Sequence, residues 1–159
     1  MKSIRIYCKN DGMYHDVPKG ATLEEVYESL GLDLGCCVTS CKVNNRVEGL
    51  HYTINDSRDL EYLTLASPSG LRTYTRSLFF VLYKAVRDLY PEAELRIGTP
   101  VSGGYFCRLT LPGGITPEVP ERLRRRMAEI VASDLPFRRV TAHTTDAIEV
   151  FRRQGFTRK

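Results

Sequence analysis

The sequence predicts an α+β protein with two domains, residues 1–66 and 67–159. In the first 66 residues, short segments with period-two alternation surround a single amphipathic helix. Residues 73–111 instead predict one long apolar helix followed by two extended segments. The balance of charge also changes after residue 66: residues 1–66 carry 7 Lys/Arg against 10 Asp/Glu, whereas residues 67–159 carry 16 Lys/Arg against 9 Asp/Glu. A net charge of −3 beside one of +7 favours two domains and directs any attraction for a polyanion to the second.

The first two strands follow from alternation and a turn. Apolar side chains alternate with polar or larger ones over residues 3–8, which is typical of a half-buried strand. Asn10-Asp11-Gly12 is a hairpin signal, and residues 13–17 return as the second strand.

A helix and further strands complete the first domain. Thr22-Leu-Glu-Glu25 forms a capping box, and Gly31 ends the helix. The remaining strands are predicted at Cys37–Val43 and Asp59–Ala66, with a short segment around Val47 between them. This ββαββ order in about 65 residues suggests a β-grasp, ubiquitin-like domain.

The second domain begins with its longest helix. Ala66–Gly70 has linker composition, because Pro68 and Gly70 fit poorly into a helix or strand. Beyond it, apolar residues recur at three- and four-residue steps around most of the helix circumference, so we expect a buried helix that ends at Pro91. Extended segments at Leu95–Thr99 and Gly104–Leu111 then predict a hairpin.

The last third of the chain predicts helix, strand and helix. Thr116 can cap a helix with Pro117 at its first position. Phe137–Ala142 is predicted to be a strand. Thr144 to Gln154 is predicted to be a short helix, with Gly155 just past its end.

Several motifs resemble parts of a known enzyme family. Pro18-Lys-Gly-Ala-Thr-Leu-Glu-Glu-Val26, the Lys42–Leu50 hairpin and the Asp59–Leu65 strand resemble a TGS domain, a β-grasp module at the front of threonyl-tRNA synthetases. The helix ending Leu89-Tyr-Pro91, followed by Ile97-Gly-Thr-Pro-Val-Ser-Gly-Gly-Tyr-Phe106, is similar to the editing domain of those synthetases, which is shared in looser form with alanyl-tRNA synthetases. The two modules occur in the same order in threonyl-tRNA synthetases.

The resemblance implies that the editing chemistry is missing. In that family the helix opens with His-x-x-x-His, and these imidazoles form the hydrolytic centre with a later Cys and His. Aligned on Leu-Tyr-Pro, the two positions hold Arg76 and Phe80, neither of which can act as a neutral imidazole. We therefore expect no catalytic residue.

The run from Ser67 to Val86 looks closer to bacterial nucleoside kinases of the uridine kinase type, in which the same modules precede a P-loop domain. The resemblance implies a non-catalytic regulatory or ligand-binding region, incomplete at its C-terminus. ATP and magnesium would be used by a kinase domain downstream in the same chain. Two alternatives remain open: an editing fragment that deacylates mischarged tRNA, and an RNA-binding module.

The candidate contact residues are basic. Their guanidinium or ammonium groups match phosphate oxygens, so we expect RNA or a nucleotide as a possible ligand. The alternative is a solvated helix face or a contact with another domain. The candidates are Arg72, Arg76, Lys84, Arg122, Arg124, Arg125 and Arg126.

The sequence favours neither a metal site nor a membrane protein. Cys36, Cys37 and Cys41 lack the four-ligand spacing of a zinc site, and the three histidines are isolated. The five cysteines suggest free thiols in a reducing compartment. No apolar run approaches the roughly 20 residues that span a bilayer, so we expect a cytoplasmic protein.

Overall fold

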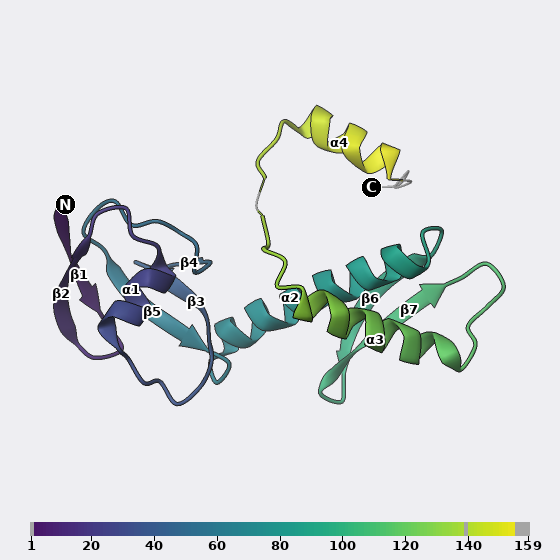
Figure 1. Ribbon diagram of the computed structural model, residues 1–159, viewed down its shortest axis with the longest axis horizontal. Coiled ribbons are helices and arrows are strands. Elements are labelled where there is room, and N and C mark those ends of the chain that lie inside the picture. Colours follow the sequence, from purple (N-terminus) through teal and green to yellow (C-terminus); the bar gives the residue numbers. More distant parts are fainter. Residues whose placement is uncertain (1, 139, 155–159) are drawn as a thin grey trace.

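The computed structural model describes residues 2–138 and 140–154 (Figure 1). It is an α+β structure with a five-stranded mixed sheet, a two-stranded hairpin and four helices among these residues. The elements are β1 (Ser3–Cys8), β2 (Met13–Pro18), α1 (Leu23–Leu30), β3 (Val38–Val43), β4 (Arg46–Glu48), β5 (Asp59–Thr64), α2 (Pro68–Leu89), β6 (Glu94–Val101), β7 (Gly104–Thr110), α3 (Glu118–Ala132) and α4 (Thr144–Arg153).

The first sheet has the strand order β2-β1-β5-β3-β4. Its central strand, β5, runs parallel to its neighbour β1, and the other neighbouring pairs are antiparallel. The prediction of two strands, a helix and further strands is confirmed, with three strands after the helix.

Helix α1 closes the core on one face of this sheet. Thr22 and Glu25 form the predicted capping box, and Gly31 ends the helix in the left-handed conformation at φ 60°. Leu23 and Val26 pack with Ile6 and Leu60 of the sheet, and all four are almost fully buried. The Tyr62 hydroxyl donates to the Leu23 carbonyl at 2.8 Å, which ties α1 to β5.

The predicted linker at Ala66–Gly70 is wrong, because α2 begins at Pro68 and packs on the sheet. Ser67 accepts a hydrogen bond from the Gly70 amide and donates one to the Thr64 carbonyl. A serine cap followed by proline is a helix start signal that outweighs the linker composition. A Cβ on Gly70 would lie 2.1 Å from the Thr64 carbonyl oxygen. The domain boundary at residue 66 stays a prediction.

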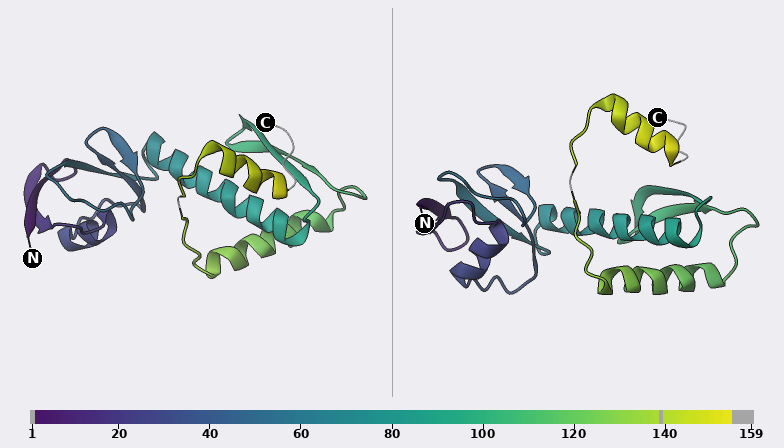
Figure 2. Two further views of the ribbon diagram at one scale, coloured as in Figure 1. Left: turned by 90° about the horizontal axis from the view of Figure 1, so that it is seen from above. Right: turned by 45° about the horizontal axis from the view of Figure 1, so that its top comes forward.

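Helix α2 lies between the hairpin and α3 (Figure 2). The predicted hairpin is confirmed as β6–β7, and Phe79 of α2 meets Tyr105 of β7 edge to face at 4.8 Å between ring centroids. The prediction of a buried helix holds for only part of α2: Ala85 and Val86 are buried, but Phe80 is 63% exposed. The wide apolar surface of α2 is only partly covered by its two neighbours.

The predicted strand at Phe137–Ala142 is also wrong. Residue 139 lies outside the described residues, and residues 137, 138 and 140–142 pair with no described strand. A strand needs the backbone groups of a neighbour, which local sequence cannot supply. Helix α4 is confirmed, while Gly155 lies outside the described residues, and α3 begins at Glu118 with no side-chain cap. No described helix is long and apolar enough to cross a membrane.

Candidate functional site

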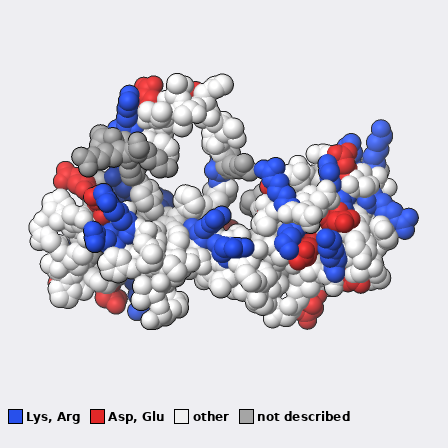
Figure 3. Space-filling view, turned by 180° about the vertical axis from the view of Figure 1, so that it is seen from behind, with Lys and Arg blue, Asp and Glu red and all other residues white. Residues whose placement is uncertain are grey.

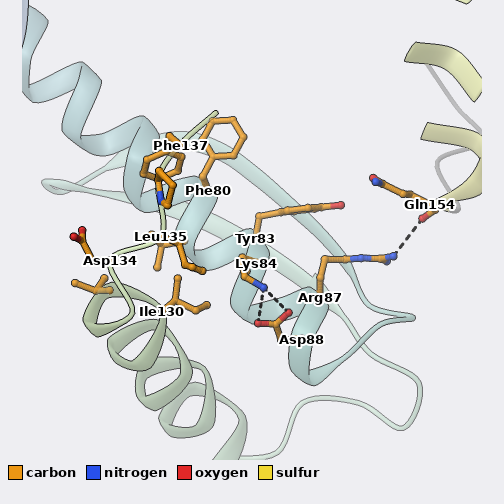
Figure 4. A pocket seen from close by; sticks show the side chains of 13 residues that line it. Phe80, Tyr83, Lys84, Arg87, Asp88, Ile130, Asp134, Leu135, Phe137 and Gln154 are labelled. Carbon is orange, nitrogen blue, oxygen red and sulfur yellow. Dashed lines mark hydrogen bonds and ion pairs between the residues drawn. The ribbon is translucent and has the colours of Figure 1, made fainter. Parts of the chain in front are cut away.

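A cleft of about 700 Å³ lies between α2 and α3 (Figure 4). Helix α2 supplies one wall, and the end of α3 with the segment after it supplies the other. The lining residues are Phe80, Val81, Tyr83, Lys84, Arg87, Asp88, Ile130, Val131, Asp134, Leu135, Pro136, Phe137 and Gln154.

One side of the cleft is apolar. The Phe80 and Phe137 rings meet edge to face with centroids 5.9 Å apart, and both rings are more than half exposed. Ile130 is buried beneath them at 7% exposure, near Leu135. The two aromatic rings therefore offer an accessible apolar surface at the cleft.

The other side of the cleft is polar and centres on Asp88. Lys84 donates to its two carboxylate oxygens at 3.0 and 3.1 Å, and Arg126 of α3 donates to Oδ2 at 2.9 and 3.1 Å. These hydrogen bonds, from Lys84 first and then Arg126, lower the pKa of Asp88. Arg126 also binds Glu129 at 2.8 Å, and this contact and the one with Asp88 raise the pKa of Arg126. The network links α2 to α3.

Arg87 brings the end of α4 to the cleft. Its guanidinium donates to the Pro91 carbonyl at 2.5 Å and to the Gln154 carbonyl at 3.4 Å. Figure 4 shows the second contact crossing from α2 toward the end of α4.

The structure separates the seven predicted contact residues. Lys84 and Arg126 meet at Asp88, so their charges are already paired. The Arg122 guanidinium lies 5.4 Å from the centre of the Tyr90 ring. Arg124 lies 3.8 Å from the Glu121 carboxylate at the surface.

The other three predicted cations are more available. In the part of the chain that the structure describes, the Arg72 guanidinium donates to the Ser69 hydroxyl at 3.1 Å and forms no ion pair with a carboxylate. Arg76 and Arg125 are exposed and make no ion pair with a carboxylate in the described part of the chain. Seen from behind, basic side chains are scattered among acidic and uncharged ones, without one continuous patch on this face (Figure 3).

The sequence prediction missed Asp88, the residue on which the polar side of the cleft depends. The spacing of Lys84 and Asp88, four residues apart on one helix, is a visible signal for their ion pair. The contact between Arg126 and Asp88 joins residues 38 positions apart and has no such local signal. Phe137 was missed because its segment was predicted to be a strand.

The described residues do not form a cluster of metal ligands. Within residues 2–138 and 140–154, no three His, Cys, Asp or Glu lie close enough to hold a metal ion. His15 binds Asp11 at 2.8 Å and His51 lies 3.4 Å from Glu24. Both pairs lie in residues 1–66, the first region of the chain, and not in residues 67–159, the second region. The two positions matched to the editing histidines, Arg76 and Phe80, are exposed on α2.

Comparison with known proteins relates nearly the whole chain to one kind of enzyme, although no family model matches it. A threonine–tRNA ligase of Desulforamulus reducens is 33% identical over 151 residues, which is 95% of this chain and 24% of that protein. The ligase of Rubrobacter xylanophilus is 31% identical over 142 residues, 89% of this chain and 22% of that protein. That of Symbiobacterium thermophilum is 28% identical over 155 residues, 98% and 24% respectively.

The chain is therefore homologous to a region of threonine–tRNA ligases, as the motifs predicted, and spans about a quarter of the length of these relatives. The prediction of a nucleoside kinase region with a downstream kinase domain is wrong, because these relatives are tRNA ligases. The expectation of ATP and magnesium depended on that kinase alone. Residues 67–86, which suggested the kinase, form the cap and most of helix α2.

Proposed function

We propose that this chain is a tRNA-binding region of the threonine–tRNA ligase type that does not hydrolyse aminoacyl-tRNA. The main support for this proposal is the match to a threonine–tRNA ligase over 95% of the chain, because the matched residues include both predicted domains. In finer detail, residues 1–66 form a β-grasp domain of the TGS type, and residues 67–159 form an editing-like domain.

The α2–α3 cleft is the proposed contact with the tRNA. Phe80 and Phe137 present accessible rings on which an unpaired base can stack, and such stacking tolerates any base. Arg76 and Arg125 are the exposed cations best able to reach phosphates, because Lys84 and Arg126 are occupied by Asp88. Recognition by stacking and phosphate contacts predicts binding with little sequence preference.

The absence of hydrolysis follows from the side chains on α2. An arginine has no accessible neutral form near pH 7, and a phenylalanine has no proton to exchange. Arg76 and Phe80 therefore cannot activate water in the way that paired histidines can.

The test is a titration of the full chain with tRNA at two salt concentrations. We expect binding that weakens steeply with salt and a salt slope that falls by roughly 0.7 to 0.9 for each phosphate contact removed. Arg76→Ala and Arg125→Ala should each lower the slope. Arg96→Ala is the matched control, because Arg96 is also exposed but already binds Glu94 at 2.7 Å.

Two outcomes would contradict the proposal. Undetectable binding at low salt, or binding that neither Arg76→Ala nor Arg125→Ala alters more than the control does, would leave these arginines as an ordinary solvated surface. Hydrolysis of aminoacyl-tRNA faster than in buffer, abolished in Arg76→Ala, would instead identify an active deacylase.

A further inference from the structure

A second cleft lies in the first region of the chain, at the turn between β3 and β4. Its volume is about 640 Å³, within the range of roughly 300 to 1,000 Å³ that is usual for small-molecule sites. Strand β4 is an edge strand of the sheet and follows directly after this turn (Figure 1). Two arginines, a tyrosine, two asparagines and one glutamate are among the lining residues.

The turn that forms this cleft is fixed to the start of β5. Asn44 has a φ of 55°, a left-handed conformation that asparagine tolerates better than most residues. Its amide donates to the Asp59 carbonyl at 2.7 Å, and its side-chain oxygen accepts from the Asp59 amide at 3.1 Å. Arg46, which follows the turn, and Arg58, which precedes β5, are thereby brought to one cleft.

Both arginines keep hydrogen-bond donors available for a ligand. The Nε atom of Arg46 lies 3.0 Å from the Glu48 carboxylate, but a guanidinium carries five N–H donors, more than this one contact uses. Arg58 lies 3.6 Å from Asp56, too far for a hydrogen bond. Two guanidinium groups that line one cleft suit the oxygens of a phosphate.

Tyr52 adds an aromatic wall to the same cleft. Its backbone is held on both sides, since its amide donates to the Gly49 carbonyl and its carbonyl accepts from the Leu23 amide. Its side chain is 41% exposed, which leaves ring surface for a flat partner. A phosphate and a flat ring system occur together in nucleotides.

We propose that the cleft binds a free mononucleotide, with Arg46 and Arg58 on the phosphate and Tyr52 against the base. The surrounding charge favours a small ligand over a nucleic-acid strand. Residues 1–66 carry a net charge of −3, so a polyanion would meet repulsion from the domain around the cleft. A single phosphate contacts only the two guanidinium groups.

The experiment is a nuclear magnetic resonance titration of the full chain with adenosine 5′-monophosphate. We expect saturable shifts of the Asn45, Arg46 and Tyr52 amides, with weaker effects from adenosine or inorganic phosphate alone. Arg46→Gln together with Arg58→Gln should weaken binding at least about tenfold, because each removes a charge-assisted contact. Lys19→Gln is the matched control, since Lys19 is an exposed cation of the same region outside the cleft.

The mapping of shifts on the unmodified chain tests the site even if the double variant fails to fold. Shifts that do not saturate, or that map away from the β3–β4 turn, would overturn the proposal. So would affinity unchanged in a folded double variant. A short RNA oligonucleotide that binds this cleft more tightly than the mononucleotide would assign it to a polymer and also overturn the proposal.

Discussion

The two halves of the chain differ in how completely they bury their own apolar residues. Among the described residues, eleven of the fifteen buried hydrophobic side chains belong to the first region. The second region buries only Ala85, Val86, Val119 and Ile130, and leaves rings such as Phe80 and Phe106 more than half exposed. The first region thus encloses a core, whereas the second depends more on surface ion pairs and partly exposed contacts.

The difference in burial shows that two regions can both be built of helices and strands and still differ in stability. Burial contributes roughly 25 cal/mol per Å² of apolar surface, so stability should concentrate in the first region. Exposed ion pairs generally contribute about 1 kcal/mol or less each. The predictions below test how far the two regions differ.

The largest expected effect comes from shortening a buried side chain in the core of the first region. Leu60 is 0% exposed at the centre of the sheet, and Leu60→Ala should lower the free energy of unfolding by about 2 to 5 kcal/mol. Phe80→Ala removes a larger side chain but one already 63% exposed, so its cost should be far smaller. Urea denaturation of both variants measures the contrast, and equal costs would refute the difference in packing.

The next largest effect is expected at Gly70, at the junction where α2 begins beside β5. Gly70→Ala would place a Cβ 2.1 Å from the Thr64 carbonyl oxygen, so the start of α2 must shift away from β5. We expect destabilisation of about 1 to 3 kcal/mol, as for overpacked sites. Gly49→Ala is the control, because a Cβ there meets nothing within 4 Å. Equal melting temperatures for the two variants would count against close packing at the junction.

Alkaline pH should weaken the first region in particular. Burial raises the pKa of the Cys41 thiol from 9.0 to about 12. Above pH 9 the unfolded thiol loses its proton while the folded one keeps it, so stability falls until the folded pKa is reached. One such group contributes a slope of about 1.4 kcal/mol per pH unit.

The alkaline slope has its own controls. Burial also raises the pKa of Tyr62 and Cys8, so Cys41→Ala should reduce the slope without abolishing it. Cys107→Ala, at an exposed thiol of the second region, should leave the slope unchanged. Urea denaturation between pH 8 and pH 11 measures these slopes, and a flat profile for the unmodified chain would be inconsistent with a buried Cys41.

The smallest expected effect is at the link between α2 and α3. Asp88→Asn removes the charge shared by Lys84 and Arg126 and should cost about 0.5 to 1 kcal/mol. Because the folded pKa of Asp88 is lowered, its contribution is present above the unfolded value of 3.8 and lost as pH falls through the folded value. The difference in stability between the variant and the unmodified chain should therefore shrink in acid. A difference independent of pH would exclude the ion pairs as its cause.

Local signals predicted most of the elements but not the packing of the second region. The capping box at Thr22 and the hairpin after Pro91 depend on residues close in sequence, and both were predicted correctly. The apolar spacing of α2 also predicted a helix, but its burial was overestimated. Periodicity reports which residues are apolar and cannot report whether a neighbour covers them.

By itself, the sequence determined the start of helix α1, the β6–β7 hairpin, the charge reversal near residue 66 and a resemblance to parts of threonyl-tRNA synthetases, but it also suggested a kinase that the relatives rule out. Only the tertiary structure decided that α2 starts on the sheet at Ser67, that Asp88 pairs with Lys84 and Arg126, and that residues 137–142 include no described strand. Caps, turns and periodicity act over a few residues of chain. Ion pairs between helices and hydrogen bonds between strands require partners that only folding brings together.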